Sequence, residues 1–257
     1  PQECEVKVSK ENDCTVIENG KIRCEITPTG KLRFKNQTGK LLLEEFERIR
    51  ADYRKEYNSA LEIVPRTFEP HQNTDNFRLT VRFEPIDGEK LYGMGQYQQP
   101  YLDVKGCTLE LAQRNSQASV PFVLSNNGYG FLWNNPAIGQ VSFGKNVTEW
   151  TAVSTKQMDY WITAGDTPAE IEEAYADATG KVPMMPDYGT GFWQCKLRYM
   201  TQDEILEVAR EYKRRKLPIS VIVVDYFHWP NQGDWKFDTD FWPDPKAMVE
   251  ELKEMGI

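Results

Sequence analysis

One carboxylate stands among aromatic side chains at the end of an apolar run. The run 221–224 consists of valine and isoleucine and stops at Asp225. The aromatic residues that follow are Tyr226, Phe227, Trp229, Trp235, Phe237, Phe241 and Trp242. Flat rings stack on the apolar face of a sugar while a carboxylate accepts hydrogen bonds from its hydroxyls, so the pattern indicates a sugar-binding site. One alternative stays open, in which Asp225 caps a strand or pairs with a lysine and the tryptophans are core.

A second apolar run, 189–197, brings further candidates toward Asp225. Trp193 lies within this run, and Arg198 follows it directly. His228 comes three residues after Asp225, where contact with a ligand and a structural hydrogen bond are equally open. Parallel α/β proteins place their chemistry at the carboxyl ends of strands, so the ends of the two runs are expected to meet.

No cofactor and no metal are expected. The pair Gly93 and Gly95 lacks the third glycine and the following helix of a dinucleotide-binding loop, and a tight strand exit suits it better. Two histidines and no CxxC spacing disfavour a zinc site. The cysteines are Cys4, Cys14, Cys24, Cys107 and Cys195. Their odd number favours free thiols, with one bridge among the first three left open.

Composition disfavours several classes of protein. The 257 residues are 40% hydrophobic and 27% charged, which is typical of a globular protein. A net charge of −8 argues against a nucleic-acid partner and suits a neutral substrate better. No apolar run approaches the ~18 residues of a membrane span, so no membrane partner is expected. No apolar secretory segment is visible, and the expected location is therefore cytoplasmic.

Short alternating runs separated by turns fill the first part of the chain. Turn pairs that end in Gly20, Gly30 and Gly39 separate runs such as 22–26, in which alternate side chains share one face. Further strands are predicted at 77–83, 121–125, 129–134 and 158–163. Many short strands with glycine and asparagine turns indicate a β-sandwich.

Three helices are predicted from about residue 166 onward. Each begins at a capping residue: Asp166 or Thr167 for the first, Thr201 with Glu204 as a capping box for the second, and Asp244 before Pro245 for the third. The first closes at Gly180, and the second is expected at about 201–216.

The runs 189–197 and 219–224 alternate with these helices, which is the order of a parallel sheet. Neither run alternates in polarity, as is typical of strands covered on both faces. Two such units cannot bury both faces of their sheet, so a free chain would aggregate, pair with a copy as a homo-oligomer or depend on the sandwich. We expect instead that the 257 residues are a portion of a longer polypeptide.

Six segments carry a resemblance to a known family. They are LYGMGQ, SVPFVLSNNGYGFLWNNP, DYWITAGDTPAEI, YGTGFWQCKLRY, VIVVDYFHW and GDWKFDTDFWPDPKAMVEELKEMG. In this order and spacing, roughly residues 15–257 resemble glycoside hydrolase family 31, which contains α-glucosidases and α-xylosidases. Within that family, the six segments are most similar to those of bacterial α-xylosidase-like members.

The resemblance implies a fold in two parts. Residues 1–182 would form a β-sandwich of the galactose-mutarotase type. Residues 183–257 would form the start of a (β/α)8 TIM barrel, truncated after two βα units. The segment 96–103 would be a sandwich loop that can reach the barrel mouth.

The resemblance also implies roles for individual residues. Asp225 would hydrogen-bond sugar hydroxyls in the −1 subsite, and Trp235 would line that subsite. Arg198 falls at the position where family members carry a side chain that helps to select between glucose and xylose. Trp193 would face either the barrel interior or the subsite. The expected substrate-binding residues are Asp225, Trp235, Arg198, Tyr226, Trp193 and His228.

The implied activity is that of a retaining α-glycosidase that hydrolyses terminal α-linked xylose or glucose of an oligosaccharide. Such a reaction uses a nucleophilic and an acid/base carboxylate about 5–5.5 Å apart. The resemblance puts both beyond Ile257, so this chain alone is expected to be inactive. A non-catalytic carbohydrate-binding module and a scaffold that awaits a partner chain are the alternatives.

Overall fold

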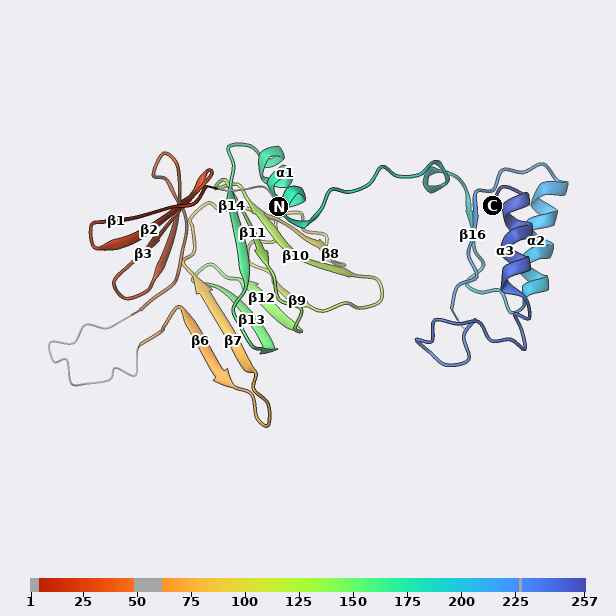
Figure 1. Cartoon of the computed structure of the whole chain (residues 1–257), viewed down its shortest axis with the longest axis horizontal. Helices are drawn as coiled ribbons and strands as arrows, with labels where there is room; N and C mark the ends of the chain where they lie inside the picture. The colour runs from red at the N-terminus through yellow and green to blue at the C-terminus, as the bar shows by residue number, and fades with distance from the viewer. Residues whose placement is uncertain (1–4, 49–61, 227) are drawn as a thin grey trace. The chain divides into compact units, whose positions relative to one another are not determined.

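The computed structural model describes residues 5–48, 62–226 and 228–257 (Figure 1). Cys4 and Phe227, named above, lie outside these ranges. The chain divides into two compact units, Pro1–Lys181 and Val182–Ile257. No helix within the described ranges is long and apolar enough to cross a membrane.

The described part of the first unit forms three antiparallel sheets. The first, in the order β1-β2-β3-β4-β5, contains β1 (Lys7–Glu11), β2 (Cys14–Asn19), β3 (Ile22–Ile26), β4 (Leu32–Asn36) and β5 (Leu41–Glu44). The second, in the order β6-β7-β13-β12-β9, contains β6 (Arg66–Pro70), β7 (Phe77–Phe83), β9 (Thr108–Leu111), β12 (Gly139–Phe143) and β13 (Thr148–Thr155). The third, in the order β14-β11-β10-β8, contains β8 (Leu91–Gln96), β10 (Ala118–Ser125), β11 (Tyr129–Trp133) and β14 (Tyr160–Ala164).

Side chains from all three sheets meet in one apolar core. Trp150 on β13 is buried in this core, with its ring 5.1 Å from that of Phe131 and 5.8 Å from that of Trp133. Alternate strand residues turn their side chains to opposite faces, so each sheet gives one face to this core. Sheets packed over a shared core agree with the β-sandwich predicted from the turns.

Gly93 and Gly95 have a different role from the one expected. They lie inside β8 rather than at a strand exit, with φ of 107° and 89°. A Cβ on Gly95 would lie 2.2 Å from the backbone oxygen of Ala118, and one on Gly93 would lie 2.7 Å from that of Phe122. The glycines therefore allow β8 to approach β10 where the register between these strands shifts.

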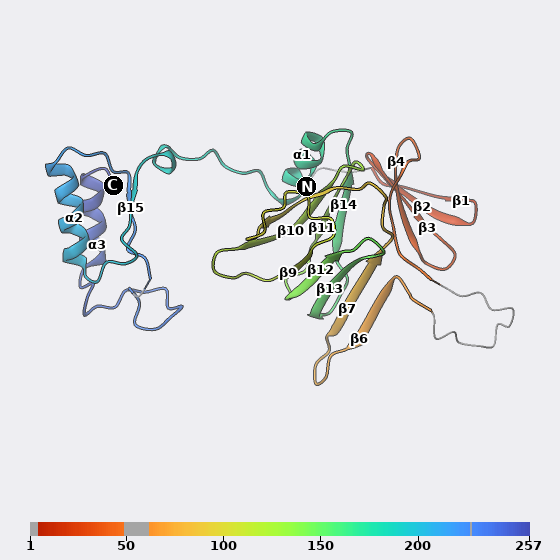
Figure 2. The same ribbon diagram turned by 180° about the vertical axis from the view of Figure 1, so that it is seen from behind.

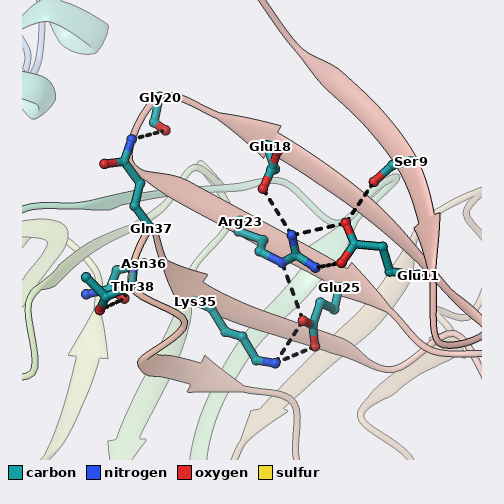
Figure 3. A network of polar contacts seen from close by, with 10 residues as sticks. All are labelled: Ser9, Glu11, Glu18, Gly20, Arg23, Glu25, Lys35, Asn36, Gln37 and Thr38. Atoms are coloured by element: carbon teal, nitrogen blue, oxygen red, sulfur yellow. Dashed lines mark hydrogen bonds and ion pairs between the residues drawn. The ribbon is translucent and has the colours of Figure 1, made fainter.

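One face of the first sheet carries a network of ion pairs, drawn in Figure 3. Arg23 on β3 contacts Glu11 at 2.6 Å and Glu18 at 3.0 Å, and Lys35 on β4 contacts Glu25 at 2.8 Å. Arg23 and Glu18 are directly opposed on neighbouring antiparallel strands, and Lys35 lies diagonally to Glu25, within reach of a long side chain. Four of these residues, Glu18, Arg23, Glu25 and Lys35, line a groove on this face, and each of their charges already has a partner in the network.

The second unit follows the predicted strand-helix order. It contains a 3-10 helix η1 (Asp187–Thr190), β15 (Trp193–Gln194), α2 (Gln202–Arg214), β16 (Val221–Ile222) and α3 (Pro245–Glu254). The two strands pair in parallel, with Trp193 opposite Val221. Both are much shorter than the predicted 189–197 and 219–224. Pairing begins only after η1 and ends three residues before Leu197 and Asp225, where φ is positive and the backbone turns.

The helix starts agree with the sequence, and of the two candidate caps of the first helix, Asp166 and Thr167, the structure uses Thr167. Thr167, Thr201 and Asp244 cap α1 (Pro168–Thr179), α2 and α3, and each accepts a bond from the backbone N–H three residues on, at 3.3, 3.2 and 2.9 Å. Helix α2 ends at Arg214, two residues before the expected end, because Lys216 adopts φ of 56°.

A second apolar core holds the two helices of this unit together. In both views of the chain α2 and α3 lie side by side (Figures 1 and 2). The buried members of this core are Tyr199, Ile205, Leu206, Ala209, Trp242, Met248 and Leu252. Ile222 of β16 and Val224 beyond it pack against the cluster, which fixes the segment that leads into Asp225.

Candidate functional site

The segments that follow β15 and β16 come together as the sequence predicted. The backbone N–H of Tyr199 donates to the oxygen of Val224 at 3.2 Å, and Arg198 and Asp225 form an isolated bridge. This bridge is antiparallel although the strands are parallel, because the chain turns at Leu197, whose φ is 75°. Residues far apart in the sequence are thereby fixed next to one another.

The carboxylate of Asp225 is held by a hydrogen bond on each oxygen. Its Oδ1 accepts the backbone N–H of Tyr226 at 2.7 Å, and its Oδ2 accepts the thiol of Cys195 at 3.3 Å. The residue itself has φ of 70°, in the left-handed region that few side-chain-bearing residues occupy and in which aspartate is enriched. The arrangement presents an oriented acceptor at the end of the parallel strands.

His228 is locked beside this carboxylate. Its Nδ1 lies 2.7 Å from the backbone oxygen of Asp225, and a carbonyl oxygen can only accept, so Nδ1 carries the proton. In the neutral ring Nε2 is then an acceptor. The rings of Trp229 and Phe237 lie 4.6 and 5.2 Å from the imidazole and restrict its orientation.

Arg198 and Tyr226 complete the group. The guanidinium carbon of Arg198 lies 5.7 Å from the centre of the Tyr226 ring, within the range of a cation–π contact. The structure thus brings together four of the six predicted residues, namely Asp225, Arg198, Tyr226 and His228. They supply an acceptor, a cationic donor, an aromatic face and an imidazole.

The two remaining predicted residues are not held by this group. Trp193 sits on β15 with its ring half exposed, and its Nε1 donates to the backbone oxygen of Tyr188 at 3.1 Å. Trp235 lies on the loop that leads to α3, and its side chain is entirely exposed. The structure therefore does not bury the Trp235 ring against Asp225.

Sequence reasoning did not identify Cys195 as part of the site. It was counted only among the thiols, of which the four in the described residues are all free. Its position at the end of the first apolar run was the signal that could have found it, because Arg198 was selected on the same ground. Gln194 was also missed: its Nε2 donates to the hydroxyl of Tyr199 at 3.1 Å, and its Oε1 accepts that of Tyr212 at 2.5 Å.

An ion pair stabilises the turn between β15 and α2. Glu204 contacts the ammonium of Lys196, and its other oxygen accepts the backbone N–H of Met200 at 2.7 Å. The bond from Lys196, followed by that from Met200, lowers the pKa of Glu204. The same pair raises the pKa of Lys196. Both groups are therefore charged near neutral pH and tie the site segment to the start of α2.

Comparison with known proteins decides the family. The model of the glycosyl hydrolases family 31 TIM-barrel domain matches residues 182–257, which contain the whole Asp225 group. An uncharacterized family 31 glucosidase of Pseudescherichia vulneris is 56% identical over 265 residues, which cover 100% of this chain and 50% of that protein. The chain belongs to glycoside hydrolase family 31.

Two proteins with stated activities are also similar. The α-xylosidase of Saccharolobus solfataricus is 36% identical over 197 residues, covering 72% of this chain and 27% of that protein. A solved family 31 α-xylosidase from a soil metagenome, complexed with xylose, is 63% identical with a TM-score of 0.86, covering 98% of this chain and 38% of that one. This family 31 chain spans half the length of its relative from Pseudescherichia vulneris and a smaller share of the other two.

Proposed function

We propose that the whole protein is a retaining α-glycosidase that releases terminal α-linked xylose, with α-linked glucose as a poorer substrate. The observation that carries the proposal is the likeness to the soil-metagenome α-xylosidase complexed with xylose, at 63% identity and a TM-score of 0.86. The α-xylosidase of Saccharolobus solfataricus, at 36% identity, supports the same preference.

The proposal includes a fold. The first unit is taken as a galactose-mutarotase-like sandwich, and β15, α2, β16 and α3 as the first two βα units of a (β/α)8 barrel. The family 31 TIM-barrel model that matches residues 182–257 supports this. So does Trp193, because a half-exposed ring on a strand would be covered once further strands closed the barrel.

In the proposed complex the Asp225 group binds the sugar of the −1 subsite. The carboxylate of Asp225 accepts hydrogen bonds from sugar hydroxyls, and Arg198 donates to a ring substituent. The aromatic face of Tyr226 packs on the apolar face of the pyranose. Xylose lacks the hydroxymethyl group of glucose, and exclusion of such a group is worth about 1–3 kcal/mol in a pocket.

Asp225 is a binding residue in this proposal and not one of the two reacting carboxylates. A retaining mechanism needs a nucleophile and an acid/base about 5–5.5 Å apart. The partners of the Asp225 oxygens are hydrogen-bond donors, the thiol of Cys195 and the N–H of Tyr226, which suit a fixed acceptor. We assign the two reacting carboxylates to parts of the whole protein outside residues 1–257, so this chain alone should not hydrolyse glycosides.

Hydrolysis of p-nitrophenyl α-D-xyloside and α-D-glucoside by the whole protein tests the proposal. We expect kcat/KM for the xyloside to exceed that for the glucoside by about tenfold or more, the difference that one substituent makes in a pocket. Proton NMR of the first released sugar should show the α anomer. Asp225→Ala should raise KM strongly, whereas Glu69→Gln, an exposed change on β6, should leave the kinetics unchanged. Absence of turnover on both substrates would contradict the proposal, and so would hydrolysis by this chain alone.

A carbohydrate-binding role without chemistry is the second candidate, and the complete exposure of Trp235 favours it. An exposed indole is a ready stacking platform for a sugar ring. Calorimetric titration of this chain with xyloglucan oligosaccharides separates the two candidates. The glycosidase proposal expects very weak binding by the unfinished subsite. Saturable binding in the micromolar range that is lost in Trp235→Ala would favour the binding module.

A further inference from the structure

We propose that Cys195 is a positioning residue for the carboxylate of Asp225. The inference deepens the proposed function, since it rests on Asp225 being the sugar-binding acceptor of the site. The thiol sulfur of Cys195 lies 3.3 Å from Oδ2 of Asp225, and a carboxylate offers only lone pairs, so the S–H group is the donor.

The two bonds on the carboxylate differ in origin. The bond from the N–H of Tyr226 to Oδ1 is local, because donor and acceptor are neighbours in the chain. The bond from Cys195 joins residues 30 positions apart and links the two strand ends. A carboxyl group held at one oxygen can still swing about its terminal torsion, whereas a bond on each oxygen fixes the plane of the group.

The backbone around this pair is held without the thiol. The bridge between Arg198 and Asp225, and the bond from the N–H of Tyr199 to the oxygen of Val224, connect the same two segments. Removal of the sulfur should therefore release the Asp225 side chain while the strand ends stay in place. This separates a positioning role from a structural one.

Packing does not account for the location of Cys195, because its side chain is exposed. Cys24 on β3 offers the contrast within the same chain: it is partly buried against the core of the first unit, and burial raises the pKa of its thiol to about 11. A thiol is also a weak donor, which leaves the lone pairs of Asp225 available to sugar hydroxyls. The site thus gains orientation without losing acceptor capacity.

The S–H stretching band tests the contact independently of any enzymatic activity. The Raman spectrum of the whole protein minus that of its Cys195→Ser variant isolates the band of this thiol. We expect it at lower frequency than the thiol band of the protein unfolded in urea, and we expect Asp225→Ala to move it to higher frequency. A band at the unfolded-protein frequency in the native protein would overturn the inference even if Asp225→Ala fails to fold.

Kinetics of the whole protein test the consequence for substrate. Cys195→Ala should raise KM for p-nitrophenyl α-D-xyloside about two- to tenfold, the range of one hydrogen bond, with kcat changed less than about twofold. Cys195→Ser restores a donor and should return KM toward the original value, and Cys14→Ala on β2 is the control. Equal loss in the serine and alanine variants, or no loss in either, would overturn the inference. If the whole protein hydrolyses no glycoside while the Raman shift is present, the proposed function fails and the contact stands.

Discussion

Trp235 and Trp242 lie on one loop between β16 and α3, yet the first side chain is entirely exposed and the second is entirely buried. Trp242 packs in the second apolar core, where the ring of Phe237 lies 5.8 Å away. Its backbone N–H donates to the oxygen of Asp238 at 2.9 Å. The loop is thus anchored at one tryptophan and presents the other to solvent.

This contrast predicts opposite effects on stability. Trp242→Ala should lower the free energy of unfolding of the second unit by about 3–5 kcal/mol, because it empties a large buried site. Trp235→Ala should change it by less than about 0.5 kcal/mol, since an exposed ring loses no packing. Urea titration followed by far-ultraviolet circular dichroism measures both. A destabilising Trp235→Ala would show that the ring is packed in solution.

The ion pair between Glu204 and Lys196 predicts a dependence of folding stability on pH. The folded-state pKa of this carboxyl is lowered by Lys196 and by the N–H of Met200, so its charge stabilises the fold above the ordinary value of 4.5. That contribution is lost as pH falls through the lowered pKa. Glu204→Gln should cost about 0.3–1 kcal/mol at pH 7, and the difference from the parent chain should vanish in acid. Urea midpoints of the parent chain and the variant, measured from pH 7 into the acid range, check this prediction. A difference between them that stays constant with pH would contradict it.

Gly95 should tolerate no side chain. Its φ is 89°, and a Cβ would lie 2.2 Å from the oxygen of Ala118, so Gly95→Ala must push β8 away from β10. We expect a loss of at least about 3 kcal/mol in the free energy of unfolding, from overpacking and backbone strain together. Gly20→Ala is the matched control: φ is 55° but no atom lies within 4 Å, so about 1 kcal/mol is expected. Similar losses of stability in Gly95→Ala and Gly20→Ala would show that backbone strain alone causes the loss and that the contact with Ala118 does not add to it.

The buried carboxyl of Glu45 predicts a dependence of stability on pH that is opposite in sign to that of Glu204. This side chain is fully buried, with Oε2 accepting the N–H of Leu32 at 2.9 Å and Oε1 lying 3.1 Å from Nε of Arg66. Burial raises its pKa, so the folded state binds the proton more tightly than the unfolded state does. The stability of the first unit should therefore fall as pH rises from below 4.5 through the raised value.

Glu45→Gln isolates this effect, because the amide keeps an acceptor for Leu32 and carries no charge. The free energy of unfolding of the variant relative to the parent chain should increase between pH 4 and pH 7. Glu69→Gln, an exposed carboxyl on β6, serves as the control and should stay within about 0.5 kcal/mol of the parent. A difference that is independent of pH would contradict the role of the Glu45 charge.

Short-range patterns in the sequence predicted much of the secondary structure. Thr201 and Asp244 were identified as helix caps from their own types and the residues just after them, and Thr167 was one of two candidates beside Asp166; each of the three makes the bond of a cap. Strand 77–83 was predicted and observed with the same bounds. These elements depend on interactions within a few residues, which a sequence window contains.

Features that depend on residues distant in the sequence were predicted less accurately. Gly93 and Gly95 were taken as a strand exit, because nothing near them in the sequence reveals that backbone oxygens of β10 occupy the space that a Cβ would need. The strands at 189–197 and 219–224 were predicted too long, because apolar composition does not reveal where pairing with the neighbouring strand begins and ends. Both features depend on partners that are distant in the chain.

The sequence by itself determined that an acidic residue, Asp225, ends an apolar run beside aromatic rings, and that the run alternates with capped helices. Tertiary structure alone decided that Cys195 donates to this carboxylate and that the Trp235 ring stays in solvent. The reason is geometric. Residue type and spacing specify local conformation, whereas contacts between residues 30 positions apart follow from the parallel pairing of β15 with β16 and from the turns that end it.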